Sequence, residues 1–197
     1  GSEMCIRDSL CEYPCDESWG YQDTGYFSPT SRYGKPEELK AFVDQCHQAG
    51  IGVILDFVPV HFAVNDYALA EYDGTALYEV KDPEMAVHPM WGTMLYNYGS
   101  PMVKDFLISN AFFWLDEFHV DGFRMDDVDA MLYLDFGREA GQWTANLYSS
   151  NENLQALEFL KHLNSIVKKQ YPGILLIAQE DGLWPQLTDS VENDHCL

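Results

Sequence analysis

The sequence predicts an α/β fold whose core is a parallel β-sheet, and three observations carry that prediction. Amphipathic segments with helical spacing alternate with short, continuous apolar runs, and this pair of patterns occurs three times. Apolar runs of this kind are typical of strands buried on both faces of a parallel sheet. Hydrophobic residues make up 47% of the 197 residues, enough for a substantial core. The pattern therefore indicates βαβ units in one domain, or in part of a larger one.

The first helix is expected over residues 36–48 and the first strand over residues 51–58. The apolar positions of the helix recur with helical spacing at Leu39, Phe42, Val43 and Cys46. Pro36 suits the first turn of a helix, and Gly50 lies just past its end. On this apolar face, Cys46 is expected to be a small buried side chain.

Two further helix–strand pairs follow. A helix over residues 101–118 would take Ser100 as its N-cap, and a strand over residues 120–126 would come directly after it. A third helix over residues 154–170 ends with two lysines, which favour a helix C-terminus. A buried strand over residues 174–178 completes the third pair.

The segment from residue 62 to residue 98 is too long for an ordinary connection between two such elements. Its aromatic residues are Tyr67, Tyr72, Tyr78, Trp91, Tyr96 and Tyr98. Because it leaves the first strand at its carboxyl end, we expect this segment to form an elaborated loop over a site at that edge.

Polar side chains gather at the carboxyl ends of the three predicted strands, where ligands bind in parallel α/β folds. They are Asp56 and His61 after the first strand, Arg124, Asp126 and Asp127 after the second, and Gln179, Glu180 and Asp181 after the third. The convergence of three strand ends on one place is the main functional signal of the sequence.

Arg124 and Asp126 are two residues apart on a strand and should point to the same side. A neighbouring guanidinium lowers the pKa of a carboxyl group, and an ionised carboxylate in a cleft can act as a nucleophile. The same pair would equally serve as a buried ion pair that bridges strands. His61 is either structural or functional, and Tyr21 could stack on a ligand ring or belong to the core. The histidines expected to be background are His47, His88, His119 and His162.

Composition excludes several classes of partner. The formal charge of −21, from 11 basic and 32 acidic residues, argues against nucleic acid and anionic membranes, because both would be repelled. No apolar run is long enough to span a membrane. Five cysteines without metal-type spacing favour a reducing compartment, hence the cytoplasm. A metal site at Asp126, Asp127 and Asp129 is not expected, because adjacent strand residues face opposite sides.

Two carboxylates surrounded by aromatic side chains suit glycosidic chemistry. Sugar rings present C–H faces to aromatic rings, and they present hydroxyl groups to Asp, His and Arg. Retaining enzymes use a nucleophilic carboxylate and a proton-donating acid about 5 Å apart. The residues by themselves thus favour a carbohydrate-active barrel.

The strand ends also resemble a known family. Segments 56–61 (DFVPVH) and 122–126 (GFRMD), with the strand end at 177–178, are similar to the first three conserved regions of the α-amylase superfamily. Within that superfamily, segments 18–39, 47–62 and 73–79 closely resemble glycogen branching enzymes. The similarity runs from about residue 11 to residue 194.

The resemblance implies a partial (β/α)₈ TIM barrel, from about the second to the fifth strand. It implies that Asp126 is the nucleophile of a retaining double displacement, and that the residues around the reacting sugar are Tyr21, Asp56, His61 and Arg124. The implied reaction cleaves α-1,4 links of an α-glucan and forms α-1,6 branches, without a cofactor or a metal. An α-glucan hydrolase of the same superfamily is the alternative.

The chain departs from the family at the third strand end. The general acid/base of branching enzymes is a glutamate, and the aligned position here is Gln179. Loss of general acid catalysis would cost on the order of 10²–10⁴-fold in rate. Glu180 could substitute only if a bulge turned it inward, because adjacent strand residues point to opposite sides. A non-catalytic glucan-binding homologue therefore stays open.

The expected organisation has three parts. Residues 1–10 look like an appended segment outside the family, residues 11–194 like the central part of the catalytic barrel with the 62–98 excursion, and residues 195–197 like an atypical end. A partial barrel exposes strand edges and half its core. We expect the isolated chain to be unstable and to lack branching activity.

Overall fold

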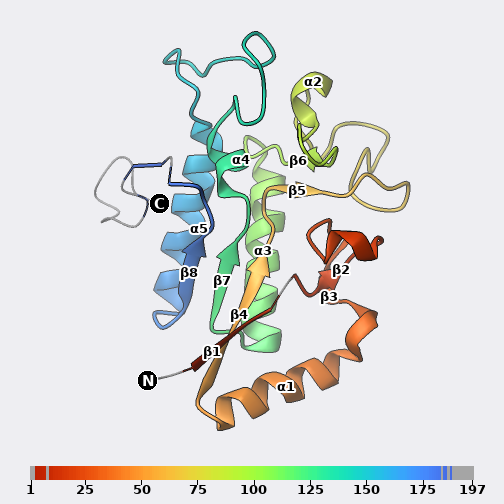
Figure 1. The fold of residues 1–197 in the computed structure, drawn as a ribbon, viewed down its shortest axis with the longest axis vertical. Helices are drawn as coiled ribbons and strands as arrows, with labels where there is room; N and C mark the ends of the chain where they lie inside the picture. The colour runs from red at the N-terminus through yellow and green to blue at the C-terminus, as the bar shows by residue number, and fades with distance from the viewer. Residues whose placement is uncertain (1–2, 8, 183, 186, 188–197) are drawn as a thin grey trace.

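The computed structural model describes residues 3–7 by their backbone, and residues 9–182, 184, 185 and 187 in full. Its centre is a parallel sheet of four strands (Figure 1). In spatial order these are β1 (Glu3–Arg7), β4 (Ile51–Phe57), β7 (Gly122–Met125) and β8 (Leu175–Ala178), each parallel to its neighbours. The predicted α/β class with a parallel sheet is thus confirmed. The three predicted strands are each one to three residues shorter than expected.

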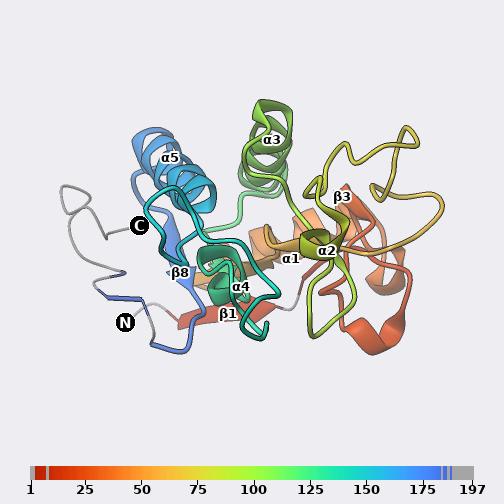
Figure 2. The same ribbon diagram turned by 90° about the horizontal axis from the view of Figure 1, so that it is seen from above.

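Three long helices alternate with the strands and have the predicted bounds: α1 (Pro36–Gln48), α3 (Pro101–Phe118) and α5 (Leu154–Gln170). Helices α3 and α5 lie side by side along one face of the sheet, as the view from above shows (Figure 2). The Asn153 side chain caps α5 by accepting a hydrogen bond from the backbone of Ala156. Ser100 stands at the predicted N-cap of α3, but its side chain makes no capping hydrogen bond.

The core lies between this face of the sheet and the two helices. Phe57 of β4 and Phe123 of β7 pack with ring centroids 5.2 Å apart. Trp114 from α3 and Phe159 from α5 are fully buried against the same cluster. Because strand residues alternate between faces, the residues beside these phenylalanines, which include Asp56, point to the opposite face of the sheet.

The prediction for Cys46 is wrong: its side chain is half-buried rather than buried. Only Val43 is fully buried on α1, whose packing contacts are with β4 and α3 on one side. Its outer side is therefore left open to solvent.

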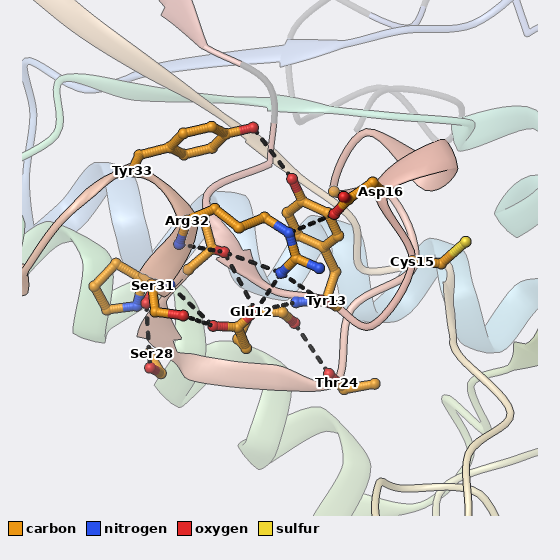
Figure 3. Close-up of polar contacts among 12 residues, drawn as sticks. Glu12, Tyr13, Cys15, Asp16, Thr24, Ser28, Ser31, Arg32 and Tyr33 are labelled. Carbon is orange, nitrogen blue, oxygen red and sulfur yellow. Dashed lines mark hydrogen bonds and ion pairs between the residues drawn. The ribbon is translucent and has the colours of Figure 1, made fainter.

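A small unit precedes α1. It contains the two-stranded antiparallel sheet of β2 (Cys11–Glu12) and β3 (Gly25–Pro29), with the short helices η1 (Asp16–Ser18) and η2 (Ser31–Tyr33). Arg32 holds it together, as Figure 3 shows. Its guanidinium bonds Glu12 at 2.7 Å and Asp16 at 2.6 Å, and lies 4.1 Å from the centre of the Tyr13 ring. These contacts fix the loop from which Tyr21 projects.

The 62–98 segment leaves the sheet at the carboxyl end of β4, as predicted, and it is folded rather than a simple loop (Figure 1). Strands β5 (His61–Phe62) and β6 (Met94–Leu95) pair in antiparallel fashion, and α2 (Pro83–Ala86) lies between them in sequence. Tyr96 is buried, and Tyr98 is anchored by a hydrogen bond to the Pro59 carbonyl at 2.7 Å. The exposed aromatic residues of the 62–98 segment are Tyr67, Tyr72 and Trp91.

The structure describes part of the N-terminal segment but not the last residues of the chain. Within the 1–10 segment, the backbone of residues 3–7 pairs in register with β4, Glu3 opposite Ile51 and Arg7 opposite Leu55. The expected atypical end at residues 195–197 lies outside the described residues, as does the stretch 188–194 before it.

Candidate functional site

The sheet register brings the predicted carboxylate and guanidinium together. Asp56 of β4 lies directly opposite Arg124 of β7, on the face turned away from α3 and α5. Arg124 Nη1 lies 2.6 Å from Asp56 Oδ2 and 3.2 Å from Asp126 Oδ1. Arg124 and Asp126 therefore point to the same side, as the strand period predicts. One guanidinium thus bridges two carboxylates at the carboxyl end of the sheet.

Tyr21 joins the same group from the other end of the sequence. Its hydroxyl donates to Asp56 Oδ2 at 2.5 Å. The loop that carries Tyr21 is tightly packed: Gly20 has φ +89°, and a Cβ there would lie 2.5 Å from the Ser9 carbonyl oxygen. A side chain at position 20 would clash with the Ser9 backbone, so the turn that leads into Tyr21 requires glycine.

The charges of this group are shifted by burial and by one another. Burial raises the pKa of Asp126, Arg124 lowers it, and the neighbouring Asp127 and Asp56 raise it, so the net direction is upward. The expectation that Arg124 holds the pKa of Asp126 below its usual range is wrong, because burial outweighs the guanidinium. Burial lowers the pKa of Arg124, but Asp56 and Asp126 raise it by more, so the net direction is upward. Asp56 is only 3% exposed, and its buried Oδ1 has no hydrogen-bond partner among the described residues.

His61 lies in the buried layer beside this group. It is 3% exposed, and its ring packs edge-on against His88, with centroids 5.3 Å apart. Burial and the nearby His88 lower the pKa of His61 to about 4, with Asp127 acting in the opposite direction. The imidazole is therefore neutral at pH 7, and it offers a polar atom rather than a charge to this end of the sheet.

His88, expected to be background, contacts a residue beside the predicted nucleophile. Its side chain is fully buried, and its Nε2 lies 2.9 Å from Asp127 Oδ2. Asp127 follows the predicted nucleophile directly, so His88 belongs to the surroundings of the site. Nothing in the sequence pairs two residues that are 39 positions apart. The sole hint is that His88 falls within the segment expected to cover the strand ends.

The two candidate acid positions face different surroundings. Gln179 Oε1 accepts a hydrogen bond from the backbone N–H of Asp127 at 3.0 Å, which places its side chain beside the turn after Asp126. Glu180 accepts instead from the backbone of Trp184 at 3.2 Å, and its charge raises the pKa of Asp129. The geometry thus turns position 179, rather than position 180, toward Asp126.

Three further observations concern metal sites, membrane-spanning helices and cavities. Among the described residues, no group of three or more His, Cys, Asp or Glu side chains is placed to hold a metal ion. Within the same residues, no helix combines the length and hydrophobicity that crossing a membrane requires. A cavity of about 450 Å³ lies between β3 and α1, lined by Leu10, Tyr33 and Phe42 among others, and it shares no lining residue with the carboxylate group.

Comparison with known proteins places these residues in context. Residues 12–82 match the family model of the α-amylase catalytic domain. The chain is 56% identical over 179 residues to the 1,4-α-glucan branching enzyme of Methylococcus capsulatus, covering 91% of this chain and 24% of that protein. It is 54% identical to the branching enzyme of Cutibacterium acnes, covering 93% and 29%. The chain thus spans about a quarter of the length of these relatives.

The fold has a solved counterpart. The structure superimposes on an α-amylase from Geobacillus thermoleovorans, crystallised with acarbose, with a TM-score of 0.65 and 19% identity, covering 89% of this chain and 36% of the amylase. At this identity the likeness supports the fold alone. It confirms the predicted partial (β/α)₈ barrel, and the sequence comparisons confirm the resemblance to branching enzymes.

Proposed function

We propose that this chain, which is similar over nine-tenths of its length to the branching enzymes of the α-amylase superfamily, carries the catalytic carboxylates of a 1,4-α-glucan branching enzyme. The single observation that carries the proposal is the Tyr21–Asp56–Arg124–Asp126 group at the carboxyl edge of the sheet. Strands β4, β7 and β8 would be the third to fifth of the barrel. Strand β1, although it lies in the 1–10 segment expected outside the family, takes the place of the second strand beside β4. The substrate would be an α-1,4-glucan.

The proposed reaction proceeds by double displacement. Asp126 attacks the anomeric carbon of a glucose unit, the bond from that carbon to the O4 of the next unit breaks, and O4 takes a proton from the general acid. The glycosyl ester on Asp126 is then attacked by the 6-hydroxyl of another chain, whose proton passes to the base. Two inversions retain the α-configuration and leave an α-1,6 branch.

Each neighbour has a task in this scheme. Burial raises the pKa of Asp126, and Arg124, which lies against it, lowers that pKa in part. Arg124 thus favours the ionised form of Asp126 that attack requires. Asp56 is held by Tyr21 and Arg124 through one oxygen, and its second, buried oxygen is an acceptor without a partner among the described residues, which a sugar hydroxyl that reached it would satisfy. Neutral His61 would be a further contact to the sugar.

Gln179 is the weak point of the scheme, because an amide has no acidic proton to give to O4. A glutamate is nearly isosteric, and its carboxylate could accept the same N–H from Asp127. In its protonated form that carboxyl group could give its proton to O4, as a general acid does. The contacts of Glu180 with Trp184 and Asp129 make it the poorer candidate for rescue.

The location we propose is the cytoplasm. It rests on the described cysteines, which are free: Cys11 is buried, Cys15 exposed and Cys46 half-buried. Unpaired thiols of this kind are typical of a reducing compartment.

The test uses a chimera in which this chain replaces the 179 matched residues of the Methylococcus capsulatus enzyme. Branching of amylose is followed by loss of iodine colour and by debranching analysis. We expect Gln179→Glu to raise the rate by about 10²–10⁴-fold over the parent chimera. Adding Asp126→Asn should abolish that gain, and Glu180→Gln should not.

Each alternative has its own signature in the same assay. A Gln179→Glu chimera that binds amylose but transfers nothing would indicate a glucan-binding homologue. Release of reducing sugar without new α-1,6 links would indicate a hydrolase. Turnover that persists with Asp126→Asn would remove Asp126 as the nucleophile, and turnover lost with Glu180→Gln would assign the acid to Glu180.

A further inference from the structure

We infer that His88 is a positioning residue, which fixes the turn after Asp126 and, through that turn, the segment that carries position 179. The inference rests on the proposed function for the role of Asp126 and of position 179. The contacts themselves stand without it. They run from the 62–98 excursion, through Asp127, to the end of β8.

The tautomer of His88 follows from its contacts. Its Nδ1 accepts from the backbone N–H groups of Met90 and Trp91, at 3.3 and 3.4 Å. A neutral imidazole carries one N–H, so the proton is on Nε2 when Nδ1 is the acceptor. Nε2 therefore donates to Asp127 Oδ2, at 2.9 Å. A fully buried ring with both nitrogens bonded has one orientation, and it presents one donor at a fixed place.

Asp127 needs such a partner, because its backbone is left-handed, with φ +53°. This conformation is unfavourable for most non-glycine residues, and it persists where the surroundings hold it. It turns the backbone N–H of Asp127 toward Gln179 Oε1, at 3.0 Å, while the side chain turns toward His88. The bond to His88 thus stabilises the conformation that reaches position 179.

Two more hydrogen bonds join the same turn to the end of β8. The backbone N–H of Val128 donates to the Gln179 carbonyl at 3.1 Å. Asp129, 4% exposed, accepts from the backbone N–H of Asp181 at 2.8 Å. Together with the bond from Asp127, they attach residues 127–129 to the acid position itself and to Asp181, two residues beyond it.

The consequence for the reaction is geometric. Asp126 directly precedes Asp127, and Asp127 bonds the side chain at position 179. The positions of the attacking carboxylate and of the acid therefore both depend on the turn at Asp127, which His88 holds by a hydrogen bond. A misplacement of about 1 Å between reacting groups can cost on the order of 10²-fold in rate. Loss of the His88 donor should therefore lower kcat, while substrate contacts made by other residues keep KM.

The first arm of the experiment measures kcat and KM in the Gln179→Glu chimera. His88→Phe keeps a ring against its neighbours but removes the donor, and His88→Gln restores an N–H at similar reach. We expect His88→Phe to lower kcat about 10- to 100-fold with KM within about 3-fold, and His88→Gln to recover most of that loss. The exposed His162 of α5, substituted in the same two ways, is the matched control and should change neither constant.

The second arm needs no turnover. Amide hydrogen exchange of the same chimera, read by mass spectrometry, should show faster exchange at residues 127–129 and 179–181 in His88→Phe, with α5 unchanged and His88→Gln protected. Unchanged exchange at these residues would overturn the inference, as would protection lost throughout the chain in both variants. If the chimera has no activity but exchange responds as expected, the positioning role holds and the branching function fails.

Discussion

Replacing Asp23 by asparagine should stabilise the chain near neutral pH and remove part of its pH dependence. Asp23 is 2% exposed, and its carboxylate oxygens are reached by the Ser9 hydroxyl at 3.2 and 3.4 Å. Burial raises its pKa from 3.8 to about 8, against the lowering effect of hydrogen bonds from Ser9 and Cys11. The folded chain therefore holds a proton on this group at pH 7, where the unfolded chain has released it.

The sign of the effect follows from that difference. A group whose pKa is raised by folding contributes stability that is fully present below its unfolded pKa, here about 4, and that is lost as pH rises to about 8. Each pKa unit is worth about 1.4 kcal/mol, so the loss is about 4 kcal/mol at pH 7 and at most about 6 kcal/mol above pH 8. Asparagine carries no charge, and its oxygen can still accept from Ser9. Its additional N–H groups would cost about 1–3 kcal/mol if they stay unpaired.

The assay is urea unfolding of the chain, followed by tryptophan fluorescence between pH 4.5 and 8.5. The stability of Asp23→Asn relative to the parent should increase with pH by several kcal/mol, from a small loss at pH 4.5 to a gain of about 2–4 kcal/mol at pH 8. Asp66→Asn, at an exposed aspartate, is the control and should leave the two curves parallel. Parallel curves for Asp23→Asn as well would refute the reasoning.

Three further predictions concern the same architecture. Burial and a neighbouring imidazole lower the pKa of His61 from 6.5 to about 4. The contribution of His61 to the unfolding free energy is therefore present above pH 6.5 and lost as pH falls to about 4. His61→Gln should remove about 3 kcal/mol of that loss at acid pH, measured by urea unfolding. Gly122→Ala should lower the unfolding free energy by about 1–3 kcal/mol, because its Cβ would lie 2.5 Å from the Leu175 carbonyl oxygen and would part β7 from β8. Tyr98→Phe should cost about 1–2 kcal/mol in urea unfolding, since it leaves the Pro59 carbonyl without its 2.7 Å hydrogen bond.

Matched variants give these predictions their controls. Gly173→Ala places its Cβ where no atom lies within 4 Å, so it should change stability by less than Gly122→Ala. Tyr67 is 72% exposed, so Tyr67→Phe should be nearly neutral. Equal effects of the two glycine variants, or of the two tyrosine variants, would contradict the packing argument.

The sequence predicted the helices and the site edge well, because both depend on local patterns. The spacing of Leu39 and Val43, with Pro36 in the first turn, marks a helix wherever it packs, and α1 has the predicted bounds. Likewise, Asp56 and Arg124 stand at the ends of apolar runs, and parallel strands bring such ends together. The period of two along a strand was enough to place Arg124 and Asp126 on one side.

Tertiary structure alone decided the rest, because burial and long-range pairing are not written in local periodicity. His88 and Asp127 meet only after the excursion folds back over the strand ends, and no spacing rule joins them. The pKa of Asp126 moves upward because burial outweighs Arg124, and a sequence gives the charges without the depth at which they lie. What the chain order determined is which groups reach the carboxyl edge of the sheet. What the fold decided is how deeply each is buried and which partner holds it.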